Sequence, residues 1–597
     1  MTDLPRVRLR DLVRGAVRWT PRLPRTAHAL LTVLRADGGA RVSMGSLVER
    51  NGRRHRDETA LLFDDSRWTW RELNLDANRL AHAFTSLGIG HGDVVALLVE
   101  SRPPLLLAIV ALAKLGATAG LVNTTLRGPS LSHSITVTGA VRVVVGEELA
   151  GAFEEARGDL PDLGAPLYVA DTGAPAPRGW LDLDVLSRDA PFGNPRSTRS
   201  VTLGDRLFTI PTSGTTGLPK ASVMSHMRWV KAGDTAGRIL WNLRPGEVVY
   251  VPLPFFHNMA LSIGWGAVVA AGAAMLMRRN LSVSAFWDDC RRHGAVAFPY
   301  IGELPRYLLN APERPDDAAN PVRAVLGVGM RAEVWGPFAR RFGIEDVFEM
   351  YSASEANTAF VNPFGIEGTV GFSPSPYALL AWDAEAQAPR RDRAGRYVRA
   401  RKGEPGLLVA RVSDRYRYDG YTDAAASEAK LLRDVFRRGD AWVDTGDLLR
   451  HVGWRHAQFV DRVGDTFRWR SENVSTLAVE QALGRFPGIA DCTVYGVEVP
   501  GAPGRAGMAA IVGAVDLDAL AAHLFAELQE PAVPVFLRLV ASLETTATFK
   551  NRKVALRTDG FDPACGDPIF VRLPRTRTWA QLDERTFSAL AAGAVVF

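Results

Sequence analysis

A run of nine residues, 212–220, has the composition of a phosphate-binding loop. Its sequence, TSGTTGLPK, combines small hydroxyl side chains with glycines and ends on a lysine. Successive N–H groups of a glycine-rich turn form a concave anion site, hydroxyl groups add donors, and the lysine adds a positive charge. The spacing differs from the P-loop pattern G-x-x-x-x-G-K-[ST], because Gly214 and Gly217 are three residues apart and Ala221 follows Lys220. The run therefore predicts a nucleotide-phosphate loop of another type.

Further segments downstream contain residue types that nucleotide chemistry uses. YSASE, residues 351–355, ends on a carboxylate, and Mg²⁺ beside substrate phosphates prefers hard oxygen ligands. DTGDLL spans residues 444–449, DRVGDTFRW spans 461–469, and TATFKNRKV spans 546–554. A lysine of the last segment could stabilise the charge that develops at a reacting phosphate. Taken alone, a Thr-Gly-Asp is usually a turn and a single lysine is usually solvated, so the order of the segments is what gives them weight.

In this order the segments resemble the signatures of the adenylate-forming enzymes, the superfamily of acyl-CoA synthetases, luciferases and peptide-synthetase adenylation domains. The resemblance implies that the loop holds the β- and γ-phosphates of ATP. The residues concerned are Thr212, Ser213, Gly214, Thr215, Thr216, Gly217 and Lys220.

The same resemblance assigns roles to the other segments. Tyr351 would line the adenine and Ser354 would contact phosphate, while Glu355 would bind Mg²⁺. LGVGMR, residues 326–331, stands where the family has its adenine-lining turn, which implies nucleotide contacts for Gly327, Gly329 and Met330. Asp447 would accept hydrogen bonds from the ribose hydroxyls, and Arg462 would contact the nucleotide.

Catalysis is assigned in the same way. The resemblance places Lys550 at the catalytic lysine of the family, acting together with Glu355 and Thr212. It places Gly464 and Asp465 at the hinge on which a small C-terminal domain swings between two half-reactions.

Several stretches resemble one branch of the superfamily, the fatty acid transport proteins and very-long-chain acyl-CoA synthetases. These are the KLGA segment at 114–117, YIGELPRYLLNAP at 300–312, DVFRRGDAWVDTGDLL at 434–449 and DRVGDTFRWRSENVST at 461–476. The branch implies an acyl pocket that includes His257, Tyr300 and Gly302. The chain departs from the branch at Ser471, where a glycine is common, and at residues 6–19, where a basic helix replaces an apolar anchor.

The implied reaction joins a long- or very-long-chain fatty acid to CoA in two steps. ATP and the acid give acyl-adenylate and pyrophosphate, and CoA then displaces AMP, so ATP, Mg²⁺ and CoA are the expected cofactors and co-substrates. Coupling to fatty acid uptake stays open. So do three alternatives: a steroid- or bile-acid-type CoA ligase, an acyl-AMP ligase that feeds a carrier protein, and a non-enzymatic lipid transporter.

The elements that would position these residues follow an alternating pattern. Continuous apolar runs such as DVVALLVE, EVVYVPLP and AVAFPY read as buried strands, and amphipathic helices separate them. We therefore expect an α/β fold, with a large multi-layer adenylation domain of mostly parallel sheets and a small mobile α+β C-terminal domain. The expected divisions are residues 1–45 as a basic amphipathic segment, 46–461 as the AMP-binding domain and 462–597 as the lid domain.

Composition is that of an ordinary soluble chain. The 597 residues are 47% hydrophobic and 23% charged, and 71 basic against 65 acidic residues give a net charge of +6. That excess is too mild to indicate nucleic acid. Three scattered cysteines fit a reducing compartment, and we expect a cytoplasmic protein. Self-association is left open.

Two segments raise the question of a membrane. Residues 259–277 contain no charge over 19 positions, but they are rich in alanine and glycine, which favours a buried helix. Residues 6–19 place apolar side chains at helical spacing beside a row of arginines that recurs every four residues. The apolar residues are Leu9, Leu12, Val13, Ala16 and Val17, and the arginines are Arg6, Arg10, Arg14 and Arg18. Such a basic amphipathic helix either rests on an anionic membrane at the inner face of the cell membrane or packs against its own domain. The sequence leaves both alternatives open.

Overall fold

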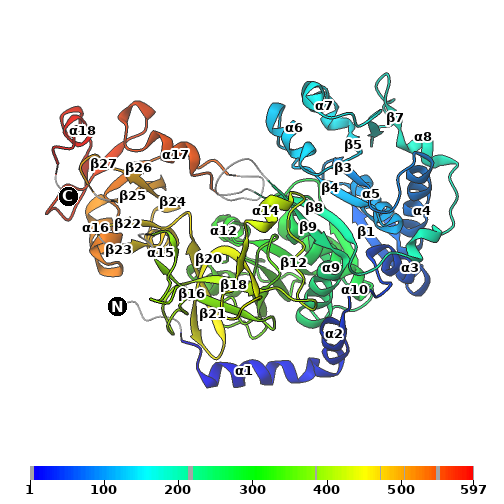
Figure 1. Ribbon diagram of the computed structural model, residues 1–597, viewed down its shortest axis with the longest axis horizontal. Helices are drawn as coiled ribbons and strands as arrows, with labels where there is room; N and C mark the ends of the chain where they lie inside the picture. The colour runs from blue at the N-terminus through cyan, green and yellow to red at the C-terminus, as the bar shows by residue number, and fades with distance from the viewer. Residues whose placement is uncertain are drawn as a thin grey trace.

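A computed structural model describes residues 6–212, 220–383, 386–470, 472–502, 504–545, 551–595 and 597. Figure 1 shows the amino-terminal sheets and helices on the right of the molecule, the middle of the chain at the centre and the carboxy-terminal part at the upper left. The predicted phosphate-loop residues 213–219, and also Ser471 and Lys550, lie outside the described residues.

A seven-stranded sheet forms the amino-terminal side of the molecule, in the order β7-β6-β5-β3-β4-β8-β9. Its strands are parallel except for β9, which pairs with β8 in antiparallel fashion. Strand β3 is buried along its whole length, as its continuous apolar sequence VVALL predicts. The strands are β3 (Val94–Leu98), β4 (Thr118–Leu121), β5 (Arg142–Gly146), β6 (Leu167–Val169), β7 (Leu181–Asp182), β8 (Arg206–Thr212) and β9 (Lys220–Ser225).

An eight-stranded sheet follows, in the order β15-β14-β13-β12-β10-β11-β1-β2. Its inner strands are parallel, and the edge strands β15 and β2 are antiparallel to their neighbours. The strands are β1 (Thr59–Phe63), β2 (Ser66–Thr69), β10 (Val248–Val251), β11 (Ala274–Met277), β12 (Ala295–Ile301), β13 (Ala324–Val328), β14 (Asp346–Ser352) and β15 (Ala359–Asn362).

Helices pack between and around these two sheets. One hydrophobic core joins strands of both sheets to α3, α4, α5, α9 and α10, and α5 is apolar on nearly every side because it lies inside this core. The helices of this part are α1 (Leu9–Trp19), α2 (Leu23–Arg35), α3 (Met44–Arg54), α4 (Trp70–Ser86), α5 (Pro103–Leu115), α6 (Gly128–Thr136), α7 (Ala150–Ala156), α8 (Leu183–Arg188), α9 (His226–Gly233), α10 (Gly266–Ala271), α11 (Phe286–His293), α12 (Glu303–Asn310) and α13 (Ala332–Arg341), with π-helical turns at Asp234–Leu240 and Met259–Trp265.

A six-stranded antiparallel sheet completes the middle of the chain. Strand β20 lies at its centre and pairs with β18, β19 and β21. The elements are β16 (Tyr377–Asp383), β17 (Ala388–Pro389), β18 (Gly406–Arg411), α14 (Ala424–Glu428), β19 (Leu431–Arg433), β20 (Ala441–Gly453) and β21 (His456–Arg462).

The carboxy-terminal part has a hydrophobic core of its own, which begins at Phe467. A five-stranded sheet and a short hairpin support it. The elements are β22 (Phe467–Trp469), β23 (Glu472–Val474), α15 (Thr476–Gly484), β24 (Ile489–Glu498), β25 (Arg505–Gly513), α16 (Leu517–Glu527), β26 (Phe536–Leu539), α17 (Val554–Asp559), β27 (Ile569–Val571), β28 (Ala580–Gln581) and α18 (Glu584–Ala591). The predicted fold class, a large α/β part of mostly parallel sheets and a smaller α+β part, is confirmed.

The uncharged segment 259–277 is buried, but it is not one helix. The helical part ends at Ala271, and the last residues form strand β11 inside the eight-stranded sheet. Gly272 has φ +69°, a left-handed conformation that ends helices and that other residues rarely adopt. The part of the chain that the structure describes contains no helix long and apolar enough to cross a membrane.

Candidate active site

The predicted phosphate loop connects two antiparallel strands. Thr212 is the last residue of β8 and Lys220 is the first of β9, and the two are direct Cα partners in the pairing. The Thr212 hydroxyl donates to the Lys220 carbonyl oxygen at 3.3 Å. The structure thus fixes both ends of the loop, whereas the predicted phosphate contacts of Ser213, Gly214, Thr215, Thr216 and Gly217 fall outside the described residues.

The segment that contains Ser354 and Glu355 is fastened to the same hairpin. The Ser222 hydroxyl, on β9, donates to the Ser354 carbonyl oxygen at 2.8 Å. The buried Arg228 guanidinium donates to the carbonyl oxygens of Ser354 and Ala356 at 2.9 and 2.8 Å. These bonds hold the predicted Mg²⁺ ligand, Glu355, beside the strand that starts at the loop lysine.

Two tyrosines, Tyr418 and Tyr421, lie within electrostatic reach of Glu355, and Tyr421 also lies close to Lys220. Burial raises the pKa of Tyr418 to about 12, with a further contribution from the negative charge of Glu355. Burial and the same charge also raise the pKa of Tyr421. The Lys220 ammonium lies 5.5 Å from the centre of the Tyr421 ring. A loop cation and a carboxylate therefore both lie near Tyr421, which suits a site for a metal–phosphate complex.

Tyr351, Asp447 and Arg462 form a second cluster. The Tyr351 hydroxyl donates to Asp447 Oδ2 at 2.6 Å, and Arg462 Nε lies 3.8 Å from Asp447 Oδ1. Asp447 and Arg462 are Cα partners on the paired strands β20 and β21, which explains their proximity although fifteen positions separate them. Burial, followed by the Asp447 charge, raises the pKa of Tyr351. The structure thus brings together three residues that were predicted to bind adenine, ribose and nucleotide.

A buried glutamate that the sequence analysis did not single out supports the predicted adenine turn. Glu349, on β14, accepts hydrogen bonds from the backbone N–H groups of Gly329 and Met330, the latter at 3.4 Å. Its Oε2 also lies 2.5 Å from the hydroxyl of Tyr300, which in turn lies 3.0 Å from the Phe348 carbonyl oxygen. Tyr300 is fully buried. The only sequence signal for this role is an acidic residue inside the apolar strand DVFEMYS.

Of the other predicted acyl-pocket residues, Gly302 lies beside this turn and His257 follows strand β10 of the eight-stranded sheet. Gly302 packs against the Gly329 carbonyl so closely that a Cβ at this position would collide with backbone. His257 is half-buried in the connection after β10, and its Nδ1 accepts from the Met259 N–H at 3.2 Å. The roles of His257, Tyr300 and Gly302 in binding an acyl chain stay predictions.

The predicted hinge joins β21 to the carboxy-terminal part. Asp465 forms an ion pair with Arg557 of α17 at 2.8 Å. Asp461 Oδ2 accepts from the Thr476 N–H at 2.7 Å, and burial raises the pKa of Asp461 to about 6. A further ion pair joins the middle of the chain to the carboxy-terminal part, between Arg306 of α12 and Asp491 of β24 at 2.9 Å. Polar and charged contacts of this kind connect the hinge segment and the carboxy-terminal part to their surroundings, and they can break when a domain moves.

Comparison with protein families decides the classification. The profile described as "AMP-binding enzyme" matches residues 48–412, which is more than half of the 597 residues. The chain belongs to the AMP-binding enzyme family. A second profile, "AMP-binding enzyme C-terminal domain", matches residues 478–550.

Curated relatives of this AMP-binding enzyme extend along nearly its whole length. The medium/long-chain-fatty-acid–CoA ligase FadD6 of Mycobacterium tuberculosis is 41% identical over 569 residues, covering 95% of this chain and 94% of that protein. Long-chain fatty acid transport protein 1 of Mus musculus is 36% identical over 560 residues, covering 90% of this chain and 86% of that protein. The predicted resemblance to adenylate-forming enzymes and to the fatty acid transport protein branch is confirmed.

Solved structures share the fold of the AMP-binding enzyme. The anthranilate CoA ligase AuaEII in complex with anthranoyl-AMP aligns with a TM-score of 0.73 at 20% identity, over 87% of this chain and 97% of that one. A benzoate CoA ligase from Burkholderia xenovorans LB400 aligns with a TM-score of 0.72 at 20% identity, over 86% of this chain and all of that one. At this identity the alignments establish the fold alone.

The site of the AMP-binding enzyme fits a magnesium ion that arrives with ATP. Within the described residues, no group of three or more His, Cys, Asp or Glu side chains is placed to hold a metal by itself. Mg²⁺ is commonly bound through one or two carboxylates together with substrate phosphates. Glu355 acts electrostatically on Tyr421, whose ring lies 5.5 Å from the Lys220 ammonium, and this suits that arrangement.

We expect Glu349 to make the stability of the AMP-binding enzyme depend on pH. Burial, only partly offset by hydrogen bonds from Tyr300, Gly329 and Met330, raises the pKa of Glu349 from 4.5 to about 8. Between these values the folded protein keeps a proton that the unfolded chain has lost, so the free energy of unfolding falls as the pH rises through this window. A protonated Glu349 also satisfies Tyr300, because it donates to the hydroxyl oxygen while Tyr300 donates to the Phe348 carbonyl oxygen.

Glu349→Gln copies the protonated form, so its Tm should fall less than that of the wild type between pH 5 and pH 8.5. Glu349→Ala leaves backbone N–H groups of the adenine turn without acceptors, and it should cost about 1–3 kcal/mol of stability and raise the KM for ATP. Thermal unfolding over the pH range measures the first effect. The exposed Glu498, 79% accessible, provides the matched control Glu498→Gln. Equal pH profiles for wild type and Glu349→Gln would refute the assignment of the proton.

Proposed function

We propose that the protein is a long- or very-long-chain fatty-acid–CoA ligase: fatty acid + ATP + CoA → acyl-CoA + AMP + pyrophosphate. The observation that supports this most is the 41% identity to a medium/long-chain-fatty-acid–CoA ligase along 95% of the chain. The gathering of Thr212, Lys220, Glu355, Tyr351 and Asp447 around two connected clusters agrees with it.

In the first half-reaction a carboxylate oxygen of the fatty acid attacks the α-phosphorus of ATP, and the bond to pyrophosphate breaks. Asp447 holds the ribose, with Tyr351 and Arg462 fixing its orientation, and the 212–220 loop grips the leaving phosphates. Mg²⁺ held by Glu355 would neutralise phosphate charge. Lys550 stabilises the negative charge that grows on the α-phosphate oxygens as the carboxylate attacks.

In the second half-reaction the CoA thiol, after losing its proton, attacks the carbonyl carbon of the acyl-adenylate, and AMP leaves. A carboxylate is a poor electrophile, whereas the mixed anhydride has AMP as a good leaving group. We propose that residues 462–597 swing about Gly464 and Asp465 relative to residues 46–461, which removes Lys550 and admits CoA. The ion pair between Arg306 and Asp491, which joins the two units, would break in that motion.

Acyl-CoA formation across a series of acids tests this proposal. We expect turnover with medium to very long fatty acids, release of one pyrophosphate per acyl-CoA, and CoA as a sufficient acceptor. Preference for a sterol acid would favour the steroid-acid ligase. Acyl-adenylate that reacts only with a carrier protein would favour the acyl-AMP ligase, and lipid uptake without turnover would favour the transporter. Activity confined to acetate or aryl acids would refute the fatty-acid assignment.

We also propose a peripheral location at the inner face of the cell membrane, reached through residues 6–19. ATP and CoA are substrates of the cytoplasm, and the free thiols of Cys290, Cys492 and Cys565 agree with a reducing compartment. A role in fatty acid uptake would follow if acyl-CoA formation at this surface removes the free acid from the bilayer.

A further inference from the structure

Helix α1 is fastened to the rest of the molecule along one side. The Trp19 indole N–H donates to the Pro363 carbonyl oxygen at 2.6 Å, and the Val7 N–H donates to the Val452 carbonyl oxygen at 3.0 Å. Between these bonds Gly15 is buried against Phe364, and a Cβ at this position would lie only 2.6 Å from that side chain. The helix therefore cannot turn its other faces toward the domain. Figure 1 shows it running along the lower edge of the molecule.

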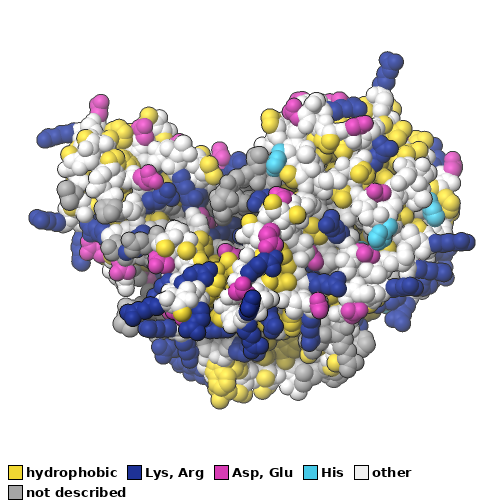
Figure 2. Space-filling model, viewed as in Figure 1, with side chains coloured by type: hydrophobic (Ala, Val, Ile, Leu, Met, Phe, Trp, Pro, Cys, Tyr) yellow, Lys and Arg dark blue, Asp and Glu magenta, His cyan; other side chains and the backbone are white. Residues whose placement is uncertain are grey.

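The side of α1 away from the domain is apolar and uncovered. Leu9, Val13 and Val17 repeat every four residues, which places them in one stripe, and they are 58, 53 and 66% exposed. Two apolar residues of α2, Leu30 and Leu31, are 49 and 47% exposed. Figure 2 shows hydrophobic side chains at the lower edge, where α1 lies in Figure 1, with Lys and Arg side chains beside them. An exposed apolar stripe on a helix of this kind marks an interaction surface.

A row of arginines follows the same helix one residue later. Arg10, Arg14 and Arg18 also repeat every four residues, and a shift of one position is about 100° around the axis, so the row runs along one edge of the apolar stripe. Within the described part of the chain, Arg14 forms no ion pair. Arg18 lies 3.3 Å from Asp346 and donates to the Glu345 carbonyl oxygen at 2.8 Å.

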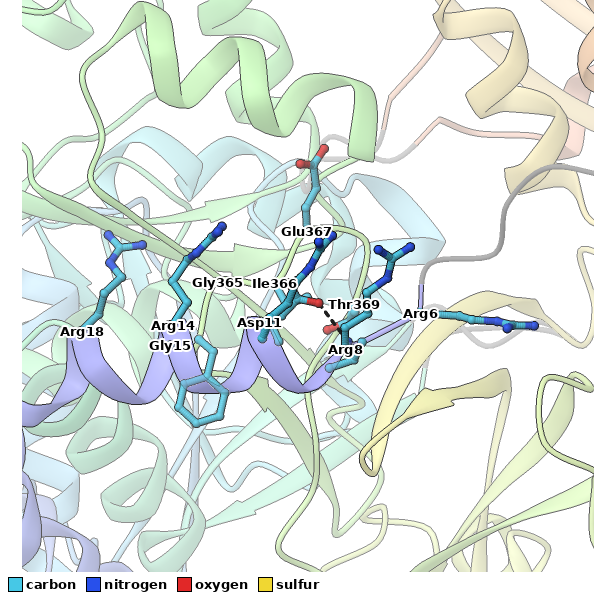
Figure 3. Close-up of a pocket in the computed structure, with 13 residues that line it drawn as sticks. Arg6, Arg8, Asp11, Arg14, Gly15, Arg18, Gly365, Ile366, Glu367 and Thr369 are labelled. Atoms are coloured by element: carbon cyan, nitrogen blue, oxygen red, sulfur yellow. Dashed lines mark hydrogen bonds and ion pairs between the residues drawn. The ribbon is translucent and has the colours of Figure 1, made fainter.

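The arginine row borders a cavity between α1 and the loop of residues 364–369. The cavity has a volume of about 560 Å³ and is open to solvent. Figure 3 shows Arg14, Arg18 and Glu367 extending to the same side of the helix, with Arg6 reaching past its start. Two carboxylates, those of Asp11 and Glu367, are outnumbered by the five arginines that line the cavity, which are Arg6, Arg8, Arg10, Arg14 and Arg18.

We propose that this face binds an anionic phospholipid surface, with the apolar stripe at the boundary of the acyl chains and the arginine-lined cavity holding lipid phosphate groups. A helix in this position buries its apolar face several ångströms below the headgroups. Guanidinium groups bind phosphate through two parallel N–H···O bonds, so arginine is suited to the cavity. Adjacent apolar and cationic rows on one fixed helix match the order of acyl chains and phosphates in a bilayer.

The attachment of α1 gives the bound molecule one orientation. Arg18 and Arg22 both pair with Asp346, the first residue of β14, and Tyr351 lies near the other end of that strand. Asp346 thus links helix α1 to the strand that carries Tyr351 of the nucleotide cluster. This inference deepens the membrane contact proposed above, but it does not depend on the ligase activity.

Co-sedimentation of the full-length protein with vesicles tests the inference. We expect binding to phosphatidylcholine vesicles that contain phosphatidylglycerol, at least tenfold weaker binding to pure phosphatidylcholine, and loss of most binding at about 1 M salt, where the Debye length is about 3 Å. The variants Val13→Asp with Val17→Asp, and Arg10→Glu with Arg14→Glu, should each weaken binding at least tenfold. Matched controls are Val185→Asp, at a valine that is 56% exposed on α8, and Arg396→Glu, at a side chain that is 77% exposed.

Several outcomes would overturn the inference. Binding by both variant pairs at wild-type strength would do so, as would equal binding to both kinds of vesicle. Saturable binding of inorganic phosphate without vesicle binding would assign the cavity to a free anion. A change from oligomer to monomer in Val13→Asp with Val17→Asp, without a loss of vesicle binding, would assign the stripe to a second copy of the chain.

Ligase activity on a soluble medium-chain acid without lipid separates this inference from the proposed function. Variants that keep ligase activity but no longer bind vesicles support both proposals. Wild-type protein that is active but does not bind vesicles refutes only the proposed lipid-binding face. Wild-type protein that binds vesicles but forms no acyl-CoA refutes the ligase alone. Unchanged Tm values of the variants establish that the exposed substitutions leave the fold intact.

Discussion

Replacing Lys550 by alanine should abolish acyl-adenylate formation while sparing the thioester step. Removing a single group that stabilises charge in a transition state lowers kcat by about 10²–10³-fold. The effect should be confined to the first half-reaction, because we propose that Lys550 leaves the site before CoA enters. The measurement is pyrophosphate release from ATP and fatty acid, compared with acyl-CoA formation from synthetic acyl-adenylate and CoA.

The exposed Lys402 provides the matched control, and Lys402→Ala should leave both half-reactions unchanged. Equal losses in the two half-reactions of Lys550→Ala would contradict the domain swing, because they would place Lys550 in one fixed site for both steps. Retention of pyrophosphate release would contradict its catalytic role.

Replacing Asp447 by alanine should have the second large effect, on nucleotide binding. A hydrogen bond to a charged group contributes about 1.5–3 kcal/mol. If Asp447 accepts two from the ribose, its loss should reduce kcat/KM for ATP by roughly 10²–10⁴-fold, since about 1.4 kcal/mol corresponds to a factor of ten. The KM for the fatty acid should change little. Steady-state kinetics with each substrate varied in turn measures this difference.

The Tyr351 hydroxyl makes the Asp447 variant informative about stability as well. Asp447→Ala removes an acceptor that lies 2.6 Å from the buried hydroxyl, and this should cost about 1–3 kcal/mol of unfolding free energy. Adding Tyr351→Phe removes the unsatisfied group, so the double variant should regain much of the stability but none of the ATP affinity. If the double variant loses as much stability as the two single variants added together, the coupling between Asp447 and Tyr351 is contradicted.

The order of the motifs made the candidate site predictable, because the family resemblance names residues far apart in the chain. The structure adds how they meet. Ser354 and Ser222 are joined by a hydrogen bond at 2.8 Å, and Asp447 faces Arg462 across two paired strands. The Asp447–Arg462 pairing follows from the register of one hairpin, whereas the Ser222–Ser354 bond joins segments far apart in the chain, which no local sequence pattern encodes.

Glu349 shows why part of the site could not be predicted. Strand periodicity locates this glutamate in an apolar strand, but its partners Tyr300, Gly329 and Met330 come from two other segments. The end of the helix within 259–277 was missed for a different reason, since a single glycine, Gly272, stops the helix inside an otherwise uniform apolar run.

Helix α1 combines a correct prediction with an open one. Its spacing predicted the helix and its two rows of side chains, but not which side would face the domain. The decisive residue is Gly15, whose missing side chain allows contact with Phe364, so the helix docks through the side that carries Gly15 and leaves Val13 and Val17 exposed. The alternatives of docking and membrane contact are therefore compatible, because they use different sides of one helix.

A single-turnover experiment tests the two-step reaction most directly. The purified protein is mixed with a radiolabelled long-chain fatty acid, ATP and Mg²⁺, without CoA, and the products are separated. We predict acyl-adenylate in an amount close to one per protein, matched by pyrophosphate, and its conversion to acyl-CoA when CoA is added together with a scavenger that removes free ATP. Formation of ADP, or acyl-CoA that appears without a preceding acyl-adenylate, would contradict the account.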